Sequence, residues 1–130
     1  EAAGITGVIM DSQTADIYNP KVIRSTMGAV FRVPFVYVED LKAALLQLKD
    51  HGVHLYAAHL KGQNSYDQED YTESTGFLIG NEAQGLSDEI ASLADTYVKI
   101  PMAGSVESLN AAIASSVLMF EVARQRRNQK

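Results

Sequence analysis

The chain has 130 residues, of which 46% are hydrophobic and 21% are charged. A chain of this length can bury a core of its own, and this composition is typical of one globular domain rather than of a disordered segment. No apolar run is long enough to span a bilayer, and no signal peptide is visible. The formal net charge of -5 argues against a general electrostatic grip on nucleic acid.

The sequence contains no cysteine, which excludes disulfide scaffolds and thiolate metal sites and favours a reducing, cytoplasmic location. Its only dense basic group consists of Arg124, Arg126, Arg127 and Lys130. Cations at the C-terminal end of a helix are favoured by the helix dipole, so we interpret this group as a solvated helix end. Any contact with nucleic acid must therefore be local.

The first part of the chain predicts two strands and one short helix. Residues 1–4 read as the tail of a helix closed by glycine, and no initiator methionine precedes them, so we expect an upstream part to be missing. A β-branched strand follows at residues 5–10. Asn19 is a candidate N-cap for a short helix that stops near Gly28, and the second strand covers residues 35–38.

The middle of the chain alternates helix and strand. Asp40 predicts the start of a helix over residues 41–50, whose leucines fall mainly on one face. Strands are predicted at residues 53–58 and 76–79. The polar stretch between them, residues 59–74, is expected to be an exposed loop.

The last part predicts a short helix capped by Ser87, a strand over residues 96–100, and a final helix from about residue 108 to residue 126. The apolar stripe of the final helix is predicted at four positions: Leu109, Ile113, Val117 and Phe120. Strands that alternate with helices indicate an α/β fold, with a mostly parallel sheet covered by helices on both faces.

Two polar, glycine-bearing loops, residues 79–87 and 100–110, each leave a predicted strand and enter a predicted helix. An open α/β sheet binds its ligand at the carboxyl ends of its strands. Gly80 and Gly104 leave room there for a close approach. The apolar walls of such a pocket would come from three side chains: Ile100, Met102 and Leu109. This pattern favours a flat heteroaromatic ligand with a polar tail, although turn glycines and a helix cap at Ser108 explain each loop alone equally well.

Taken together, the loops resemble a known family. Residues 80–86 (Gly-Asn-Glu-Ala-Gln-Gly-Leu) resemble the second motif of the SpoU (TrmH) family of RNA ribose 2'-O-methyltransferases, in the SPOUT superfamily. Residues 100–102 (Ile-Pro-Met) through 108–112 (Ser-Leu-Asn-Ala-Ala) resemble its third motif. Residues 19–31 are similar to the middle region of the family, so the resemblance covers essentially the whole chain.

The resemblance implies a C-terminal deep trefoil knot built from the two loops and the final helix, an exception to the rule that protein chains are not knotted. It implies S-adenosylmethionine as cofactor, a homodimer, and RNA as substrate, with ribosomal RNA slightly preferred over transfer RNA. By motif matching, the expected cofactor contacts are Gly80, Ile100 and Leu109, with Met102, Gly104 and Ala58 nearby. The expected catalytic residues are Glu82, Ser108 and Asn110.

In this family the catalytic residues are expected to position the ribose and a catalytic arginine. The reaction needs such help because a 2'-hydroxyl is a very weak acid, and its proton must be accepted as the methyl group is transferred. The first motif of the family, with its Asn and essential Arg, should lie before Glu1 and is absent, and Arg24 is not its equivalent. We therefore expect residues 1–130 to be an N-terminally truncated methyltransferase domain that binds cofactor weakly and does not catalyse methyl transfer alone.

Other functions are less well supported. His51, His54 and His59 flank a predicted strand without helical spacing or a carboxylate cluster, so we expect no metal site. A serine hydrolase is disfavoured because there is no Gly-x-Ser-x-Gly elbow. The main alternative is a non-catalytic knotted module that binds cofactor or RNA and dimerises. The presence of Glu82, Ser108 and Asn110 counts against it, since a pure scaffold has no evident need for all three.

Overall fold

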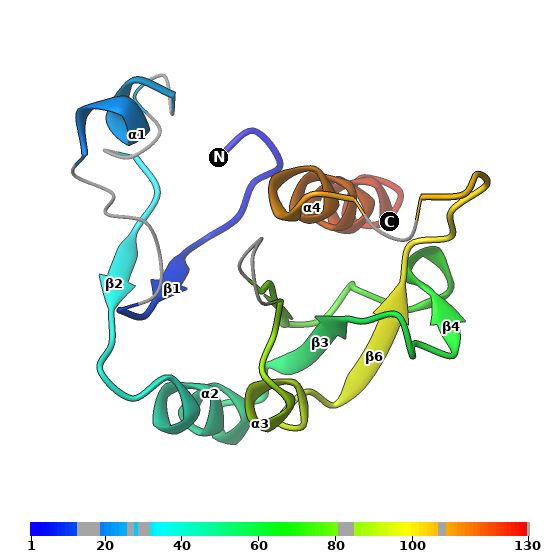
Figure 1. The fold of residues 1–130 in the computed structure, drawn as a ribbon, viewed down its shortest axis with the longest axis horizontal. Helices are drawn as coiled ribbons and strands as arrows, with labels where there is room; N and C mark the ends of the chain where they lie inside the picture. Colours follow the sequence, from blue (N-terminus) through cyan, green and yellow to red (C-terminus); the bar gives the residue numbers. More distant parts are fainter. Residues whose placement is uncertain (13–18, 26–27, 29–31, 81–84, 107–108, 130) are drawn as a thin grey trace.

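The computed structural model describes residues 1–12, 19–25, 28, 32–80, 85–106 and 109–129. The described elements, in chain order (Figure 1), are β1 (Val8–Met10), α1 (Pro20–Ser25), β2 (Phe35–Tyr37), α2 (Leu41–Asp50), β3 (His54–Ala58), β4 (Asn64–Ser65), the 3-10 helix η2 (Tyr66–Gln68), β5 (Thr75–Leu78), α3 (Asp88–Ala91), β6 (Thr96–Lys99) and α4 (Ala111–Arg127). The predicted helices and strands occur in the predicted order, with their ends shifted by a few residues, whereas β4 and η2 were not predicted.

All pairings between the described strands are parallel, and the strands form two sheets. The larger sheet has the order β4-β6-β3-β5. In its register, Tyr56 of β3 lies opposite Phe77 of β5 and Thr96 of β6. β1 and β2 form a second, two-stranded sheet, which Figure 1 shows beside the first. The mostly parallel α/β prediction is therefore confirmed, while the division into two sheets was not predicted.

Helices cover both faces of the larger sheet, because successive strand residues point to opposite faces. On one face, Leu55 and Ala57 of β3 pack with Leu45 of α2 and with residues of α3. On the other face, Tyr56 and its neighbours pack against α4. Figure 1 shows the same arrangement, with α2 and α3 on one side of β3 and β6 and α4 on the other.

Side-chain caps set the starts of the described helices. Asp40 accepts a hydrogen bond from the Ala43 amide at 3.1 Å, which fixes the start of α2 where it was predicted. Asn19 likewise accepts from the amide of Lys21 at 2.9 Å at the start of α1. The final helix begins later than predicted, at Ala111, and its N-cap is Asn110 rather than Ser108, which lies outside the described residues.

The packing face predicted for the final helix is wrong. Ile113 and Phe120 are 50% and 49% exposed, whereas Leu118 is completely buried and packs with Val98. Glu121 is also buried on this face. Its carboxylate accepts two hydrogen bonds from Arg124 and one from Gln125, and the pairing with Arg124 lowers its pKa below the ordinary value. A buried charge is tolerated only when it is paired in this way. From the sequence pattern alone, a glutamate such as Glu121 is expected to face solvent.

The stretch 59–74 is not simply an exposed loop. It contains β4 and η2, and Tyr71 within it is completely buried, which raises the pKa of its hydroxyl. Gln125 of α4 holds this stretch: its side chain accepts from the amide of Tyr71 at 2.8 Å and donates to the carbonyl of Glu69 at 2.8 Å. The error arose because these contacts join residues more than fifty positions apart in the sequence.

Candidate functional site

A cavity of about 530 Å³ lies at the carboxyl ends of β3, β5 and β6, where the chain also enters α4. Its walls come from the segments that follow these three strands and from the first turns of α4. The lining residues are Ala58, His59, Leu60, Ile79, Gly80, Gly85, Leu86, Val98, Lys99, Ile100, Met102, Leu109, Asn110, Ala111 and Ala114. This is the edge of the sheet at which the two glycine-bearing loops were predicted to form a pocket.

The predicted cofactor contacts come together here, with one exception. Ala58, Gly80 and Ile100 line the cavity from the ends of three neighbouring strands. Met102 and Leu109 line it from the segment between β6 and α4. Gly104 is not among the lining residues, and a Cβ atom added there would meet no atom within 4 Å.

Gly80 is required by chain packing at the cavity wall. A Cβ atom at this position would lie 2.2 Å from both the carbonyl carbon of Gly85 and the amide nitrogen of Leu86. Real Cβ atoms do not approach backbone so closely, so only glycine allows the two backbone segments to touch. Gly85 itself has a φ of 66°, a left-handed conformation that favours glycine. These two glycines let the first loop fold back on itself and form one wall.

Asn110 is the one predicted catalytic residue that the structure describes. Its side-chain oxygen accepts a hydrogen bond from the amide of Ile113 at 2.8 Å and so caps α4. Asn110 also lines the cavity, and its side-chain amide nitrogen is a hydrogen-bond donor. Glu82 and Ser108, the other two predicted catalytic residues, lie outside the described residues.

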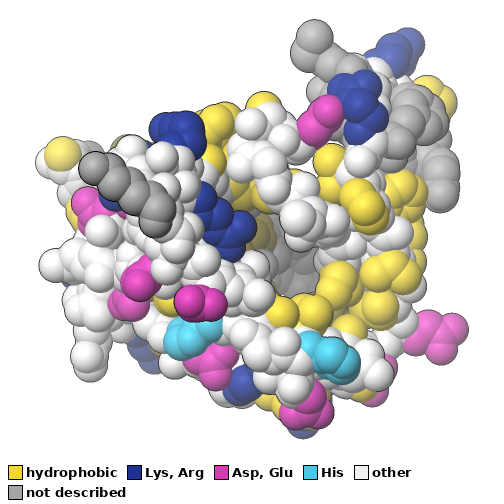
Figure 2. Space-filling view, turned by 180° about the vertical axis from the view of Figure 1, so that it is seen from behind, with side chains coloured by type: hydrophobic (Ala, Val, Ile, Leu, Met, Phe, Trp, Pro, Cys, Tyr) yellow, Lys and Arg dark blue, Asp and Glu magenta, His cyan; other side chains and the backbone are white. Residues whose placement is uncertain are grey.

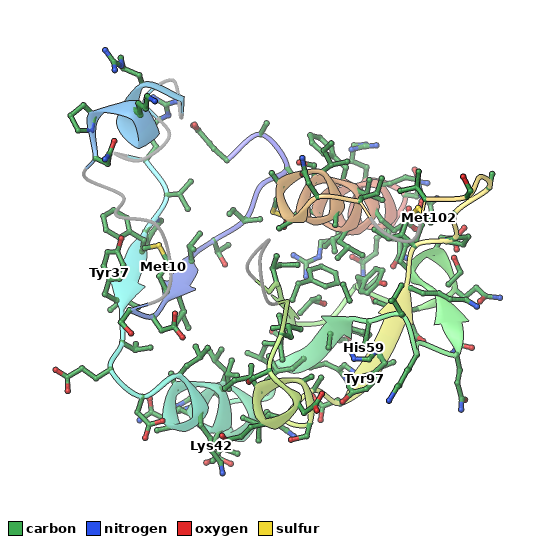
Figure 3. The ribbon with its side chains drawn as sticks, viewed as in Figure 1. Met10, Tyr37, Lys42, His59, Tyr97 and Met102 are labelled. Carbon is green, nitrogen blue, oxygen red and sulfur yellow. The ribbon has the colours of Figure 1, made fainter. Side chains whose placement is uncertain are left out.

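The cavity also has polar residues that sequence reasoning did not assign to it. His59 and Lys99 line it at the ends of β3 and β6, and no Asp or Glu occurs among its described lining residues. His59 had been considered only as a metal ligand, although its position directly after a predicted strand was a usable signal. Figure 3 shows His59 beside Tyr97 of β6, with Met102 farther along the chain on the segment after β6.

The three histidines make separate contacts. A ring nitrogen of His51 lies 2.8 Å from the carbonyl of Gln47, and one of His54 lies 2.9 Å from the hydroxyl of Thr96. His59 accepts from the amide of Lys61 at 3.0 Å. Within the described part of the chain, no three His, Asp or Glu residues are grouped to hold a metal ion. The helices in this part of the chain include none long and apolar enough to cross a membrane.

Comparison with known proteins supports the resemblance seen in the sequence. A model of the SpoU rRNA Methylase family matches residues 1–120. A TrmH family tRNA/rRNA methyltransferase of Staphylococcus aureus strain COL is 34% identical over 126 residues, which are 97% of this chain and 51% of that protein. The chain thus spans about half the length of the relative that it matches.

Solved structures give the same result. The SpoU methyltransferase AviRb of Streptomyces viridochromogenes is 36% identical, with a TM-score of 0.90 over 98% of this chain and 51% of AviRb. A structure of AviRb in complex with the cofactor AdoMet superposes with a TM-score of 0.87 over 99% and 51% of the two chains. An RNA 2'-O ribose methyltransferase is 30% identical, with a TM-score of 0.85 over 97% and 48%.

Proposed function

Because the chain belongs to the SpoU rRNA methylase family, we propose that it binds S-adenosylmethionine and serves the methylation of RNA at the 2'-oxygen of ribose. The observation that carries this proposal is the cavity, whose lining includes Ala58, Gly80, Ile100, Met102 and Leu109. AviRb, a structural relative with the same fold, has been solved with AdoMet. The 2'-oxygen is supported by the relative named as an RNA 2'-O ribose methyltransferase.

The described residues fit this cofactor. A volume of about 530 Å³ lies within the range of roughly 300 to 1,000 Å³ that is usual for small-molecule sites. The apolar side chains suit the flat adenine ring, and the backbone of the segments after β5 and β6 offers polar groups for its edges. When bound, S-adenosylmethionine supplies a methyl group activated by its sulfonium. The sulfonium loses its positive charge when the methyl group is transferred, so carboxylates nearby would stabilise the cofactor before transfer. The described lining residues include no acid that would have this effect.

The chain's own residues would orient the ribose. In the proposal, the side-chain amide nitrogen of Asn110 donates to the ribose while its oxygen remains bonded to Ile113. Glu82 and Ser108 keep the positioning roles that their motifs imply. Orientation of this kind accelerates a transfer by placing the reacting oxygen in line with the methyl group. The weakly acidic 2'-hydroxyl must also lose its proton, and we assign no described residue to that step.

The substrate and the assembly form part of the same proposal. Ribosomal RNA remains slightly preferred over transfer RNA, and the name of the Staphylococcus aureus relative includes both. We also propose a homodimer that acts in the cytoplasm. The deep trefoil knot of the C-terminal segment is proposed from the family resemblance. A crystal structure in which residues 78–112 do not pass through a loop of the chain would contradict it.

Calorimetric titration of the 130-residue chain with S-adenosylmethionine tests the central claim. We expect saturable binding with one site per chain, because one described cavity contains five of the six predicted contacts. Adenosine, which lacks the amino-acid end and the sulfonium, is the control ligand and should bind more weakly. A chain that is folded by circular dichroism and yet binds no S-adenosylmethionine would contradict the proposal.

The alternative remains a non-catalytic module that binds cofactor or RNA and dimerises. Cofactor binding without methyl transfer to RNA is the outcome we expect for these 130 residues alone, because the first-motif Asn and Arg are not in the sequence. Methyl transfer by this chain at a rate near that of an intact relative would contradict this expectation. It would also eliminate the non-catalytic alternative.

A further inference from the structure

Three basic residues lie on β6 and on the turn after β3, at this end of the cavity: His59, Lys61 and Lys99, which we call the rim cluster. His59 and Lys99 line the cavity itself, and Lys61 lies on the turn directly after His59. We propose that the rim cluster binds a phosphate of the RNA strand whose ribose is presented to the cavity. The proposal rests on the proposed function and adds the surface by which this acidic chain recognises RNA.

The turn after β3, which carries Lys61, lies against β6 close to Lys99. The amide of His59 donates to the carbonyl of Val98 at 2.9 Å, and the amide of Gly62 donates back to the carbonyl of His59 at 2.9 Å. A Cβ atom on Gly62 would lie 2.8 Å from the amide nitrogen of Lys99, so only glycine lets the turn lie directly on β6. The turn that carries Lys61 is thus held against the backbone of β6 at Lys99.

His59 is held as an oriented donor. The amide of Lys61 donates to its Nδ1 at 3.0 Å, so the neutral ring carries its hydrogen on Nε2. The ring stacks on Tyr97 with centroids 5.0 Å apart and an angle of 24° between the planes (Figure 3). No described residue accepts from Nε2. This leaves a fixed N–H donor at the cavity rim.

The two lysines are not neutralised by described acids. Lys42 and Lys49 form ion pairs with Glu89 and Asp95, whereas no described acid lies within salt-bridge distance of Lys61 or Lys99. Asp95 shares a small second pocket of about 300 Å³ with Lys61. Its carboxylate is already engaged, however, since it accepts from the amide of Leu55 at 2.8 Å and pairs with Lys49 at 3.4 Å. The exposed ammonium groups of the rim cluster therefore remain available to an external anion.

A phosphate of RNA is the anion that fits this position. The 2'-oxygen of a ribose is adjacent along the backbone to its own 3'-phosphate, so a ribose presented at the cavity brings a phosphate to the rim. The net charge of -5 argues against a broad basic field that would attract RNA, and acidic and basic side chains are interspersed over the face that Figure 2 shows. A small cluster of unpaired donors beside the reaction site would bind RNA locally, through one phosphate, without a broad basic surface.

The test measures the affinity of the 130-residue chain for single-stranded oligouridylate by fluorescence anisotropy over a series of salt concentrations. Lys61→Gln and Lys99→Gln are compared with Lys42→Gln, which removes the same charge from α2, away from the rim (Figure 3). Each rim substitution should weaken binding several-fold, and the two substitutions together should reduce the slope of log affinity against log salt by about 0.7, the value for one phosphate contact on a single strand. Lys42→Gln should change neither quantity.

Calorimetry with S-adenosylmethionine on the same variants separates the possible outcomes. Lys61→Gln should leave cofactor affinity unchanged, which supports an RNA contact. Rim variants that bind oligouridylate as Lys42→Gln does would overturn the proposal. A loss of cofactor affinity in Lys99→Gln, with no loss of RNA affinity in either rim variant, would also overturn it and assign the cluster to the cofactor's carboxylate. If the unsubstituted chain binds no S-adenosylmethionine, the proposed function fails, while the RNA measurement still decides the rim cluster.

Discussion

At the scale of single residues, the two glycines predicted to contact the cofactor differ in whether the structure requires glycine at their positions. Gly80 faces backbone so closely that any side chain would collide with Gly85 and Leu86. Gly104 faces open space. The sequence could identify both as loop glycines, but only the fold of the surrounding backbone distinguishes a position that requires glycine from one that merely has it.

Gly80→Ala should therefore be destabilising and should weaken S-adenosylmethionine binding. The added methyl group would force apart the two backbone segments of the cavity wall, at a cost of about 1–3 kcal/mol. Gly104→Ala is the matched control, with no expected change in either property. Urea unfolding measures the free energy of unfolding, and calorimetry measures the affinity. Equal effects from the two substitutions would show that the described contact does not constrain the wall.

At the scale of secondary structure elements, local signals predicted α2 well and α4 poorly. α2 has a capping Asp40 before it and a left-handed Gly52 after it, so its limits depend on neighbouring residues alone. The orientation of α4 depends on distant partners. Its buried Glu121 is stabilised by Arg124 and by Gln125, which is itself bonded to the stretch around Tyr71, and no local pattern reveals such a network.

The start of α4 gives a prediction that separates folding from catalysis. Asn110→Asp keeps an oxygen that can accept from the amide of Ile113, so the free energy of unfolding should change little. It removes the side-chain N–H donor proposed for the ribose, so methyl transfer should fall strongly in a form of the protein that turns over. Asn110→Ala loses both groups and should also cost about 1 kcal/mol of stability. Turnover that survives in Asn110→Asp would refute the positioning role.

At the scale of the whole molecule, the cavity was more predictable than its rim. The cavity walls come from two loops that can be recognised as strand–loop–helix connections in the sequence. The rim cluster depends on which strands are neighbours: β3 and β6 lie side by side although β4 and β5 separate them in the chain. Without that order, His59, Lys61 and Lys99 have no visible relation, and the C-terminal arginines were the only basic group that the sequence made apparent.

An exposed apolar face of α4 gives a prediction for the proposed homodimer. Ile113 and Phe120 are each about half exposed and lie two turns apart on α4, so they share a face that is not packed on the sheet. Apolar side chains grouped in this way are typical of an interface. Phe120→Ser should therefore shift the chain from dimer to monomer in light scattering. Leu46→Ser, which replaces an apolar residue 43% exposed on α2, is the control and should remain dimeric.

Circular dichroism and urea unfolding accompany this comparison, because a substitution that unfolds α4 would also abolish a dimer. Phe120 is half exposed in the single chain, so its replacement removes less buried surface than a core substitution and should lower the unfolding midpoint of a dilute, monomeric sample only modestly. At higher concentration the unsubstituted chain should gain stability through association, and Phe120→Ser should not, because only a folded dimer couples stability to concentration. Identical masses for all three proteins at every concentration would rule out this face of α4 as the dimer interface.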